Sequence, residues 1–122
     1  MSIRVVVVDD DPVVRLSLAR GFAAQRDIEL VGEANDGESA VTLLQRVATD
    51  VIVMDQHMPN LSGLQATERL RDLGILTPVL ILTADPRVAV EPLDLDGVGV
   101  LLKGDVGMAE TVLAVRSAAR DS

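Results

Sequence analysis

Cysteine, tryptophan and tyrosine are absent from the sequence, and Phe22 is its one aromatic residue. Without cysteine, the chain can form neither a disulfide nor a thiolate zinc site. Hydrophobic residues make up 48% of the sequence, so the core must be built mainly from valine, leucine, isoleucine and alanine. At 122 residues, the chain is long enough for one domain with a core of ordinary size.

Positive charge is scarce, with 11 Lys and Arg residues against 19 Asp and Glu residues and a formal net charge of −8. This balance argues against unaided binding to nucleic acid or to an anionic membrane, and it suits binding of a cation or of a basic partner. No apolar run approaches the roughly 20 residues of a membrane span. The first four residues do not resemble a signal peptide. We therefore expect a soluble, cytoplasmic protein.

Lysine is almost absent as well. Ten of the eleven basic residues are arginine, and Lys103 is the single lysine. A compact, flexible ammonium differs from a planar guanidinium in shape, hydration and reach, so this choice indicates a chemical requirement at position 103. The simpler alternative is a surface lysine at the end of a strand.

The sequence does contain four short apolar runs, each followed or ended by a polar residue. Runs of four or five aliphatic residues are typical of strands buried on both faces of a parallel sheet. The residues that follow the runs 5–8, 51–54, 79–82 and 98–102 are Asp9, Asp55, Thr83 and Lys103. Because the carboxyl ends of parallel strands share one edge, where open α/β sheets place their sites, we expect these side chains to meet.

Apolar residues at helical spacing fill the intervals between the runs. A fifth strand is expected over residues 28–34, followed by a turn and helix cap at 35–37. Helices are expected over residues 12–25, 40–47, 62–73 and 108–120. A fourth helix after Pro86 is doubtful, because Pro92 would end it within two turns and leave 93–97 as a loop. The alternation predicts five β-α units, a doubly wound parallel sheet and a single domain over residues 1–122.

Several carboxylates at one sheet edge repel one another, and a divalent cation relieves that repulsion. Oxygen ligands alone favour Mg²⁺ or Mn²⁺ over zinc. With the cation bound, an aspartate can attack a phosphoryl donor and form an aspartyl phosphate. A hydroxyl and an ammonium nearby would neutralise the charge of the transferred group. Asp11 has a different interpretation, since it precedes Pro12 and suits the start of a helix.

Five stretches of the chain resemble the receiver domain of bacterial two-component response regulators, in order and over nearly the full length. They are VVVVDDDPVVR, VGEANDGESAVTLL, DVIVMDQHMPNLSGLQATERLR, PVLILTA and GVLLKG. The segments IELVGEANDG and VLLKG are most similar to receivers of LuxR-type helix-turn-helix regulators. The resemblance implies a flavodoxin-like (βα)5 fold with strand order 2-1-3-4-5.

The resemblance also implies partners. A histidine kinase would supply the phosphoryl group, and phosphorylation would switch a docking surface that allows a homodimer. Control of transcription would pass through a LuxR-type DNA-binding output domain, which lies outside this chain. Such a domain catalyses only its own phosphorylation and dephosphorylation, and in that sense it is not an enzyme.

Metal-binding and phosphoacceptor roles follow from the resemblance residue by residue. Asp55 matches the phosphoacceptor, and Asp9 and Asp10 match the acidic pair. Mg²⁺ would be held by Asp10 and Asp55, by Asp9 largely through water, and by the backbone carbonyl of His57. The side chain of His57 would lie at the surface and tune the lifetime of the phosphate.

Phosphoryl-binding roles follow in the same way. Thr83 would bond one phosphoryl oxygen, and Lys103 would pair with another. The backbone N–H groups of Gln56 and Ala84 would contact the rest. Taken alone, Thr83 would be a simple hydroxyl at a strand end.

Two positions depart from the family pattern. The family usually has an aromatic residue three positions before the lysine, where its rotamer follows the threonine, and here that position is Val100. We therefore expect intact phosphorylation chemistry with an absent or altered relay from Thr83 to Val100. The family's Lys-Pro bond is Lys103-Gly104 here, so its geometry is open.

Two alternatives remain at this point. The start VVVVDDD also fits haloacid-dehalogenase-like phosphatases, with Asp9 as nucleophile and Asp11 as general acid. That class leaves Asp55 and the residues after it without a role. The other alternative is a receiver-like interaction module that is never phosphorylated.

Overall fold

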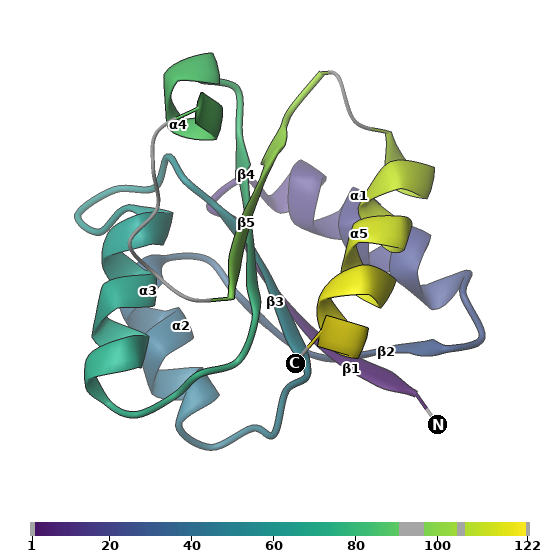
Figure 1. Cartoon of the computed structure of the whole chain (residues 1–122), viewed down its shortest axis with the longest axis horizontal. Helices are drawn as coiled ribbons and strands as arrows, with labels where there is room; N and C mark the ends of the chain where they lie inside the picture. The colour runs from purple at the N-terminus through teal and green to yellow at the C-terminus, as the bar shows by residue number, and fades with distance from the viewer. Residues whose placement is uncertain (1, 91–96, 105–106, 122) are drawn as a thin grey trace.

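The fold is built on one five-stranded parallel sheet, which lies between two pairs of helices (Figure 1). A computed structural model describes residues 2–90, 97–104 and 107–121. The strands are β1 (Ile3–Val8), β2 (Ile28–Ala34), β3 (Val51–Asp55), β4 (Val79–Thr83) and β5 (Val98–Leu102). Their order in the sheet is β2-β1-β3-β4-β5, which confirms the predicted flavodoxin-like topology.

Helices cover both faces of the sheet, as Figure 1 shows. The helices are α1 (Pro12–Ala23), α2 (Gly37–Leu44), α3 (Gly63–Asp72), α4 (Pro86–Val90) and α5 (Met108–Asp121). Buried residues of α1 and α5 pack against one face of the sheet, and buried residues of α2 and α3 pack against the other. Among the described residues, none of these helices is long and apolar enough to cross a membrane.

The apolar runs of the central strands β1, β3 and β4 are explained by burial on both faces of the sheet. Val5 and Val7 pack in the cluster on the α1/α5 side, whereas Val6 and Val8 pack in the cluster on the α2/α3 side. All four valines are at most 1% exposed. Because successive side chains of a strand point to opposite faces, a strand with helices on both sides needs apolar residues at every position. The single aromatic residue, Phe22, is fully buried on the α1/α5 side.

Polar caps set where the helices begin. Asp11 is the N-cap of α1 and accepts the Val13 N–H at 2.9 Å, which confirms its predicted place at a helix start. Asp36 accepts the Ser39 N–H at 2.7 Å and is the N-cap of α2, which confirms the predicted turn and cap at residues 35–37. Helix α2 ends earlier than predicted, at Leu44.

Helix α4 spans five described residues, Pro86–Val90, in agreement with the predicted short fourth helix. The expected effect of Pro92 and the expected loop over residues 93–96 lie outside the described residues. The peptide bond between Lys103 and Gly104 is trans, like the other described bonds. Gly104 has a φ of 92°, a conformation that favours glycine.

One irregularity interrupts the pairing of β1 with β2. The register shifts between Val5 and Val6, which leaves Val31 of β2 as an extra residue. Ile28 therefore packs on the α1/α5 side and Ala34 on the α2/α3 side, although six residues would otherwise keep them on the same face. This bulge is the physical reason why the alternation along β2 is loose.

Candidate functional site

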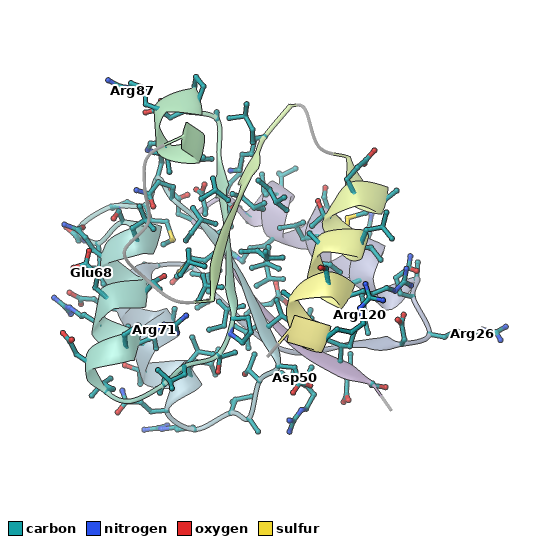
Figure 2. All side chains as sticks on the ribbon, in the orientation of Figure 1. Arg26, Asp50, Glu68, Arg71, Arg87 and Arg120 are labelled. Carbon is teal, nitrogen blue, oxygen red and sulfur yellow. The ribbon has the colours of Figure 1, made fainter. Side chains whose placement is uncertain are left out.

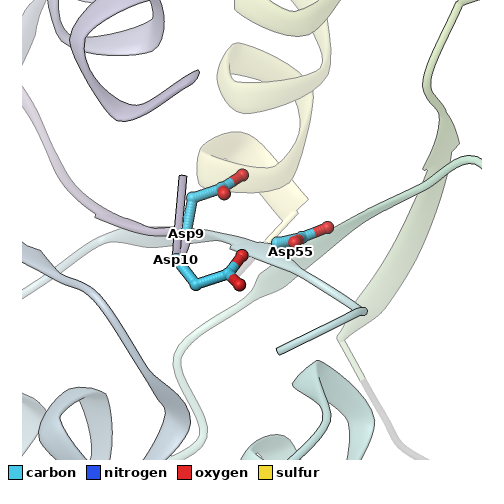
Figure 3. Close-up of side chains that lie close together, drawn as sticks. All are labelled: Asp9, Asp10 and Asp55. Carbon is cyan, nitrogen blue, oxygen red and sulfur yellow. The ribbon is translucent and has the colours of Figure 1, made fainter. Parts of the chain in front are cut away.

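Three carboxylates meet at the carboxyl ends of β1 and β3 (Figure 3). Asp9 and Asp10 follow β1, and Asp55 is the last residue of β3. The two strands are neighbours in the sheet, and one carboxylate oxygen from each aspartate lies within 4.8 Å of the others. The predicted acidic cluster at this edge is therefore confirmed.

The three aspartates differ in burial. Asp9 is 1% exposed and Asp55 is 5% exposed, whereas Asp10 faces the solvent. Burial raises the pKa of Asp9, and the negative charges of Asp55 and Asp10 add to that effect. The Asp11 N–H, which donates to Asp9 Oδ1 at 2.9 Å, and the nearby Lys103 ammonium act in the opposite direction. A cation bound nearby would therefore stabilise the ionised form of Asp9.

Lys103 provides the only described ammonium at the cluster. Its Nζ lies 2.9 Å from Asp55 Oδ1 and 3.6 Å from Asp9 Oδ2. Burial opposes the charged form of Lys103, but the hydrogen bond and attraction to Asp55 and the charge of Asp9 outweigh it and raise its pKa. The side chain of the one lysine in the sequence thus reaches both buried carboxylates.

The donor set fits a divalent cation. Three carboxylates face one ammonium, so the cluster carries excess negative charge. Asp9 Oδ2 is buried and accepts no hydrogen bond from the described residues, since the Lys103 ammonium is within ion-pair but not hydrogen-bond distance. Hard oxygen ligands with an open, solvent-facing side at Asp10 suit Mg²⁺ or Mn²⁺, which keep several water ligands.

Thr83 is the last residue of β4, the neighbour of β3 in the sheet, and its side chain is fully buried. Its hydroxyl oxygen accepts the Asp85 N–H at 3.0 Å and lies 3.1 Å from Nε2 of His57. The sequence-based interpretation used only the backbone carbonyl of His57 as a ligand and missed this contact of its ring. Spacing could not reveal the contact, because it depends on the direction of a loop side chain.

Gln56 and Ala84, the two predicted backbone donors, have different surroundings. The Gln56 N–H donates to the Leu82 carbonyl at 2.9 Å, so it is engaged between β3 and β4 in this structure. The Gln56 side chain accepts the Leu64 N–H at 2.9 Å and ties the strand end to α3. Ala84 is exposed directly after Thr83. The phosphoryl-binding role of both N–H groups stays a prediction.

Val100 lies in β5 and pairs with Ile81 of β4, two residues before Thr83. Val100 and Ile81 both pack on the α2/α3 side of the sheet, and the alternation of β4 places Thr83 on that side too. Valine has no polar atom, so this position of β5 offers the Thr83 hydroxyl no hydrogen bond.

Arg15 is a second residue that sequence reasoning missed. Its Nη1 donates to the Asp9 carbonyl at 2.7 Å, and its Nε lies 3.8 Å from Glu33 Oε1. This side chain of α1 therefore anchors the loop that carries the acidic pair. One arginine among ten gives no signal of such a role in the sequence.

Gly63 allows the first turn of α3 to lie against the backbone of Asp55. A Cβ at this position would lie 2.5 Å from the backbone carbonyl oxygen of Asp55. We expect Gly63→Ala to lower the free energy of unfolding by about 1–3 kcal/mol, because backbone atoms must move to admit the methyl group. Urea denaturation would measure the loss. Glu68→Ala, at an exposed position of the same helix, serves as the control, and equal stabilities of the two variants would contradict the expectation.

A doubly wound parallel sheet with an acidic pocket at the ends of β1 and β3 is a flavodoxin-like α/β protein with its site at the switch point of the sheet. Residues 5–115 match the family described as the response regulator receiver domain. The chain belongs to this family of receiver domains, which are generally signalling modules.

Relatives and solved structures agree with this assignment. The chain is 34% identical to the probable transcriptional regulatory protein NarL of Mycobacterium tuberculosis and 36% identical to the transcriptional regulatory protein LiaR of Bacillus subtilis, each over 121 residues. These alignments cover 98% and 97% of this chain and 56% of each relative, so the chain spans about half the length of these relatives.

The fold is similar to that of the signal receiver domain of the putative response regulator NarL from M. tuberculosis, with a TM-score of 0.89 and 34% identity over 99% of this chain and 98% of that chain. It is also similar to a LuxR-family two-component response regulator from Aurantimonas sp. SI85-9A1. The TM-score there is 0.90, with 27% identity over 99% of this chain and 87% of that chain.

Proposed function

We propose that this domain accepts a phosphoryl group from the phosphohistidine of a histidine kinase on Asp55, in a Mg²⁺-dependent reaction in the cytoplasm. The observation that carries the proposal is the meeting of three carboxylates with the Lys103 ammonium, which lies 2.9 Å from Asp55 Oδ1. This set combines an acidic nucleophile with groups that neutralise a phosphoryl group, which is what phosphoryl transfer requires.

In the proposed step, a carboxylate oxygen of Asp55 forms a bond to phosphorus while the bond from phosphorus to the kinase histidine breaks. Asp9, Asp10, Asp55 and the His57 carbonyl would hold Mg²⁺, which supplies charge neutralisation when bound. The Lys103 ammonium exchanges its contact with Asp55 for one with a phosphoryl oxygen. Burial of Asp55 limits the access of water to the acyl phosphate until the domain hydrolyses it.

The Thr83 hydroxyl would turn to a second phosphoryl oxygen, and the N–H groups of Gln56 and Ala84 would contact the third. The Gln56 N–H must first leave the Leu82 carbonyl, to which it donates in this structure. Phosphorylation would therefore change the contacts between β3 and β4. Such a change biases a two-state equilibrium that alters a docking surface.

Control of transcription is the proposed output. NarL and LiaR are regulatory proteins of transcription by their names, and the chain matches about half of each. We propose that residues 1–122 form one receiver domain that works with a LuxR-type DNA-binding domain outside this chain, through a homodimer. The net charge of −8 is consistent with DNA binding by that other domain and not by this one.

The phosphatase alternative receives less support from the site. It needs Asp11 as a general acid, yet the Asp11 carboxylate caps α1 by accepting the Val13 N–H. It also needs Asp9 as the nucleophile, while the Lys103 ammonium lies 3.6 Å from Asp9 and only 2.9 Å from Asp55. Family membership and the contact of Lys103 with Asp55 favour Asp55 instead.

Incubation with acetyl phosphate, with and without Mg²⁺, tests the proposal. We expect intact mass spectrometry to show one added phosphoryl group only when Mg²⁺ is present, and peptide mapping to place it on Asp55. A phosphoryl group on Asp9 would support the phosphatase alternative. If neither acetyl phosphate nor a phosphorylated histidine kinase adds a group, the domain is an unphosphorylated interaction module and the proposal is wrong.

A further inference from the structure

The ring of His57 contacts the one buried hydroxyl that the proposed function requires to move. His57 Nε2 lies 3.1 Å from Thr83 Oγ1, and this pair joins the loop after β3 to the end of β4. Thr83 is fully buried, whereas His57 is exposed at the surface of the domain. The contact therefore connects the interior of the site directly to the solvent-facing side of the β3–α3 loop.

The hydroxyl of Thr83 has one proton to donate. Its oxygen accepts the Asp85 N–H at 3.0 Å, and that N–H can only donate. In the tautomer of His57 that carries its proton on Nδ1, Nε2 can accept the hydroxyl proton of Thr83. A phosphoryl oxygen on Asp55 would accept the same proton, so the two acceptors compete for it.

The neighbouring strand cannot take this role. Val100 lies on the same side of the sheet as Thr83, but its side chain has no polar atom. Among the described residues, the hydrogen-bond partners of the Thr83 hydroxyl come from two loops, through His57 and Asp85, and none comes from β5.

We propose that His57 is the positioning residue of Thr83: its Nε2 holds the Thr83 hydroxyl in the unphosphorylated domain and releases it when that hydroxyl turns to the phosphoryl group. This inference rests on the proposed function, since it needs a phosphoryl group on Asp55. When Thr83 turns to the phosphoryl group, the imidazole of His57 loses its partner, and the surface of the β3–α3 loop changes. The signal then needs no aromatic side chain on β5.

The chain offers a direct readout of this exchange, because His57 is its only histidine. Nitrogen-15 NMR of the imidazole, at one fixed pH with Mg²⁺ present throughout, distinguishes an Nε2 that accepts a hydrogen bond from one exposed to water. We expect the Nε2 resonance to shift when beryllofluoride, a phosphoryl mimic, is added. We expect Thr83→Ala to shift it without beryllofluoride and to remove most of the further change.

Asp55→Asn is the control for the spectroscopic experiment, because it removes the attachment point and should leave the Nε2 resonance unmoved by beryllofluoride. The inference is wrong if wild-type Asp55 is loaded but the resonance stays in place. It is also wrong if Thr83→Ala leaves the resonance of the free domain unchanged, since the contact would then be absent in solution.

Phosphorylation rates provide a second test. Removing a neutral hydrogen bond from the starting state should speed phosphorylation by acetyl phosphate about two- to tenfold in His57→Ala. His57→Gln, which keeps a polar group in reach of Thr83, should reduce that increase. In a Thr83→Ala background, His57→Ala should have no effect on the rate, whereas a role independent of Thr83 would give the same effect in both backgrounds and contradict the inference.

Failure of this inference differs from failure of the proposed function. If Asp55 takes up no phosphoryl group from any donor, both are wrong. If Asp55 is phosphorylated while the rate and the Nε2 resonance do not depend on the His57–Thr83 pair, only the role of His57 is wrong.

Discussion

Replacing Lys103 with methionine is expected to slow phosphorylation of Asp55 by about 100- to 1,000-fold, the usual effect of removing one group that stabilises charge in a transition state. Methionine keeps much of the length and the apolar stem of lysine but removes the ammonium, which lies 2.9 Å from Asp55 Oδ1. The Arg15 guanidinium is engaged by the Asp9 carbonyl and by Glu33, so we do not expect it to replace the ammonium beside Asp55. The rate of mass gain with acetyl phosphate and Mg²⁺ would measure the effect.

Two further variants make the Lys103 result specific. Arg26→Met removes one positive charge from an exposed side chain that points away from the domain (Figure 2), and it should leave the rate nearly unchanged. Lys103→Arg keeps the charge but places a wide, planar guanidinium beside two buried carboxylates, so it should recover only part of the rate. A rate for Lys103→Met within a factor of three of the wild-type rate would contradict the assigned role.

Asp9→Asn is expected to have opposite effects on function and stability. It removes one of three carboxylates, so Mg²⁺ should bind more weakly and Mg²⁺-dependent phosphorylation of Asp55 should fall by at least about tenfold. In metal-free buffer at neutral pH, the same change should raise the free energy of unfolding by about 1–2 kcal/mol, because a buried charge with an unsatisfied oxygen is removed.

The stability difference between wild type and Asp9→Asn should depend on pH. Burial raises the pKa of Asp9 in the folded domain above its ordinary value of 3.8. The stability from the protonated form is therefore fully present below that value and is lost as the pH rises through the raised pKa. The stability advantage of Asp9→Asn should grow over the same interval, as measured by urea denaturation in EDTA. An advantage that is independent of pH would contradict the assignment to Asp9.

Asp50→Asn is a useful control for this comparison. Asp50 accepts two hydrogen bonds from the Arg4 side chain, at 3.0 and 3.1 Å, and these contacts lower its pKa. The sign is therefore reversed: Asp50 contributes stability above its ordinary pKa, and that stability is lost as the pH falls through the lowered value. Asp50→Asn should destabilise the domain at neutral pH, if only slightly at this partly exposed pair.

The centre of the sheet could be predicted from sequence because β1, β3 and β4 are buried on both faces. Runs such as Val5–Val8 have no polar position. A surface helix needs a polar face, whereas a central strand of a parallel sheet needs apolar residues on both faces. The ends of the helices were harder to predict from the sequence. The turn at residues 35–37 indicated the cap of α2, but the apolar pattern extended this helix to residue 47, whereas it ends at Leu44.

The carboxylate cluster could be predicted for a related reason. Asp9 and Asp55 follow apolar runs that topology makes neighbours, so strand order alone brings them together. The contact between His57 and Thr83 and the anchoring of Asp9 by Arg15 could not be predicted in this way. Both depend on where a long side chain of a loop or a helix points, and no periodicity in the sequence encodes that direction.

The bulge at Val31 has a consequence for how this domain behaves in a crowded solution. β2 is an edge strand, and an edge with free backbone groups can pair with a strand of another molecule. The extra residue breaks the regular spacing of those groups, and the exposed Glu29 and Glu33 place negative charge on either side of it. An incoming strand would meet an irregular, acidic edge, so the same feature that loosens the pattern of β2 protects this edge of the sheet against pairing with another molecule.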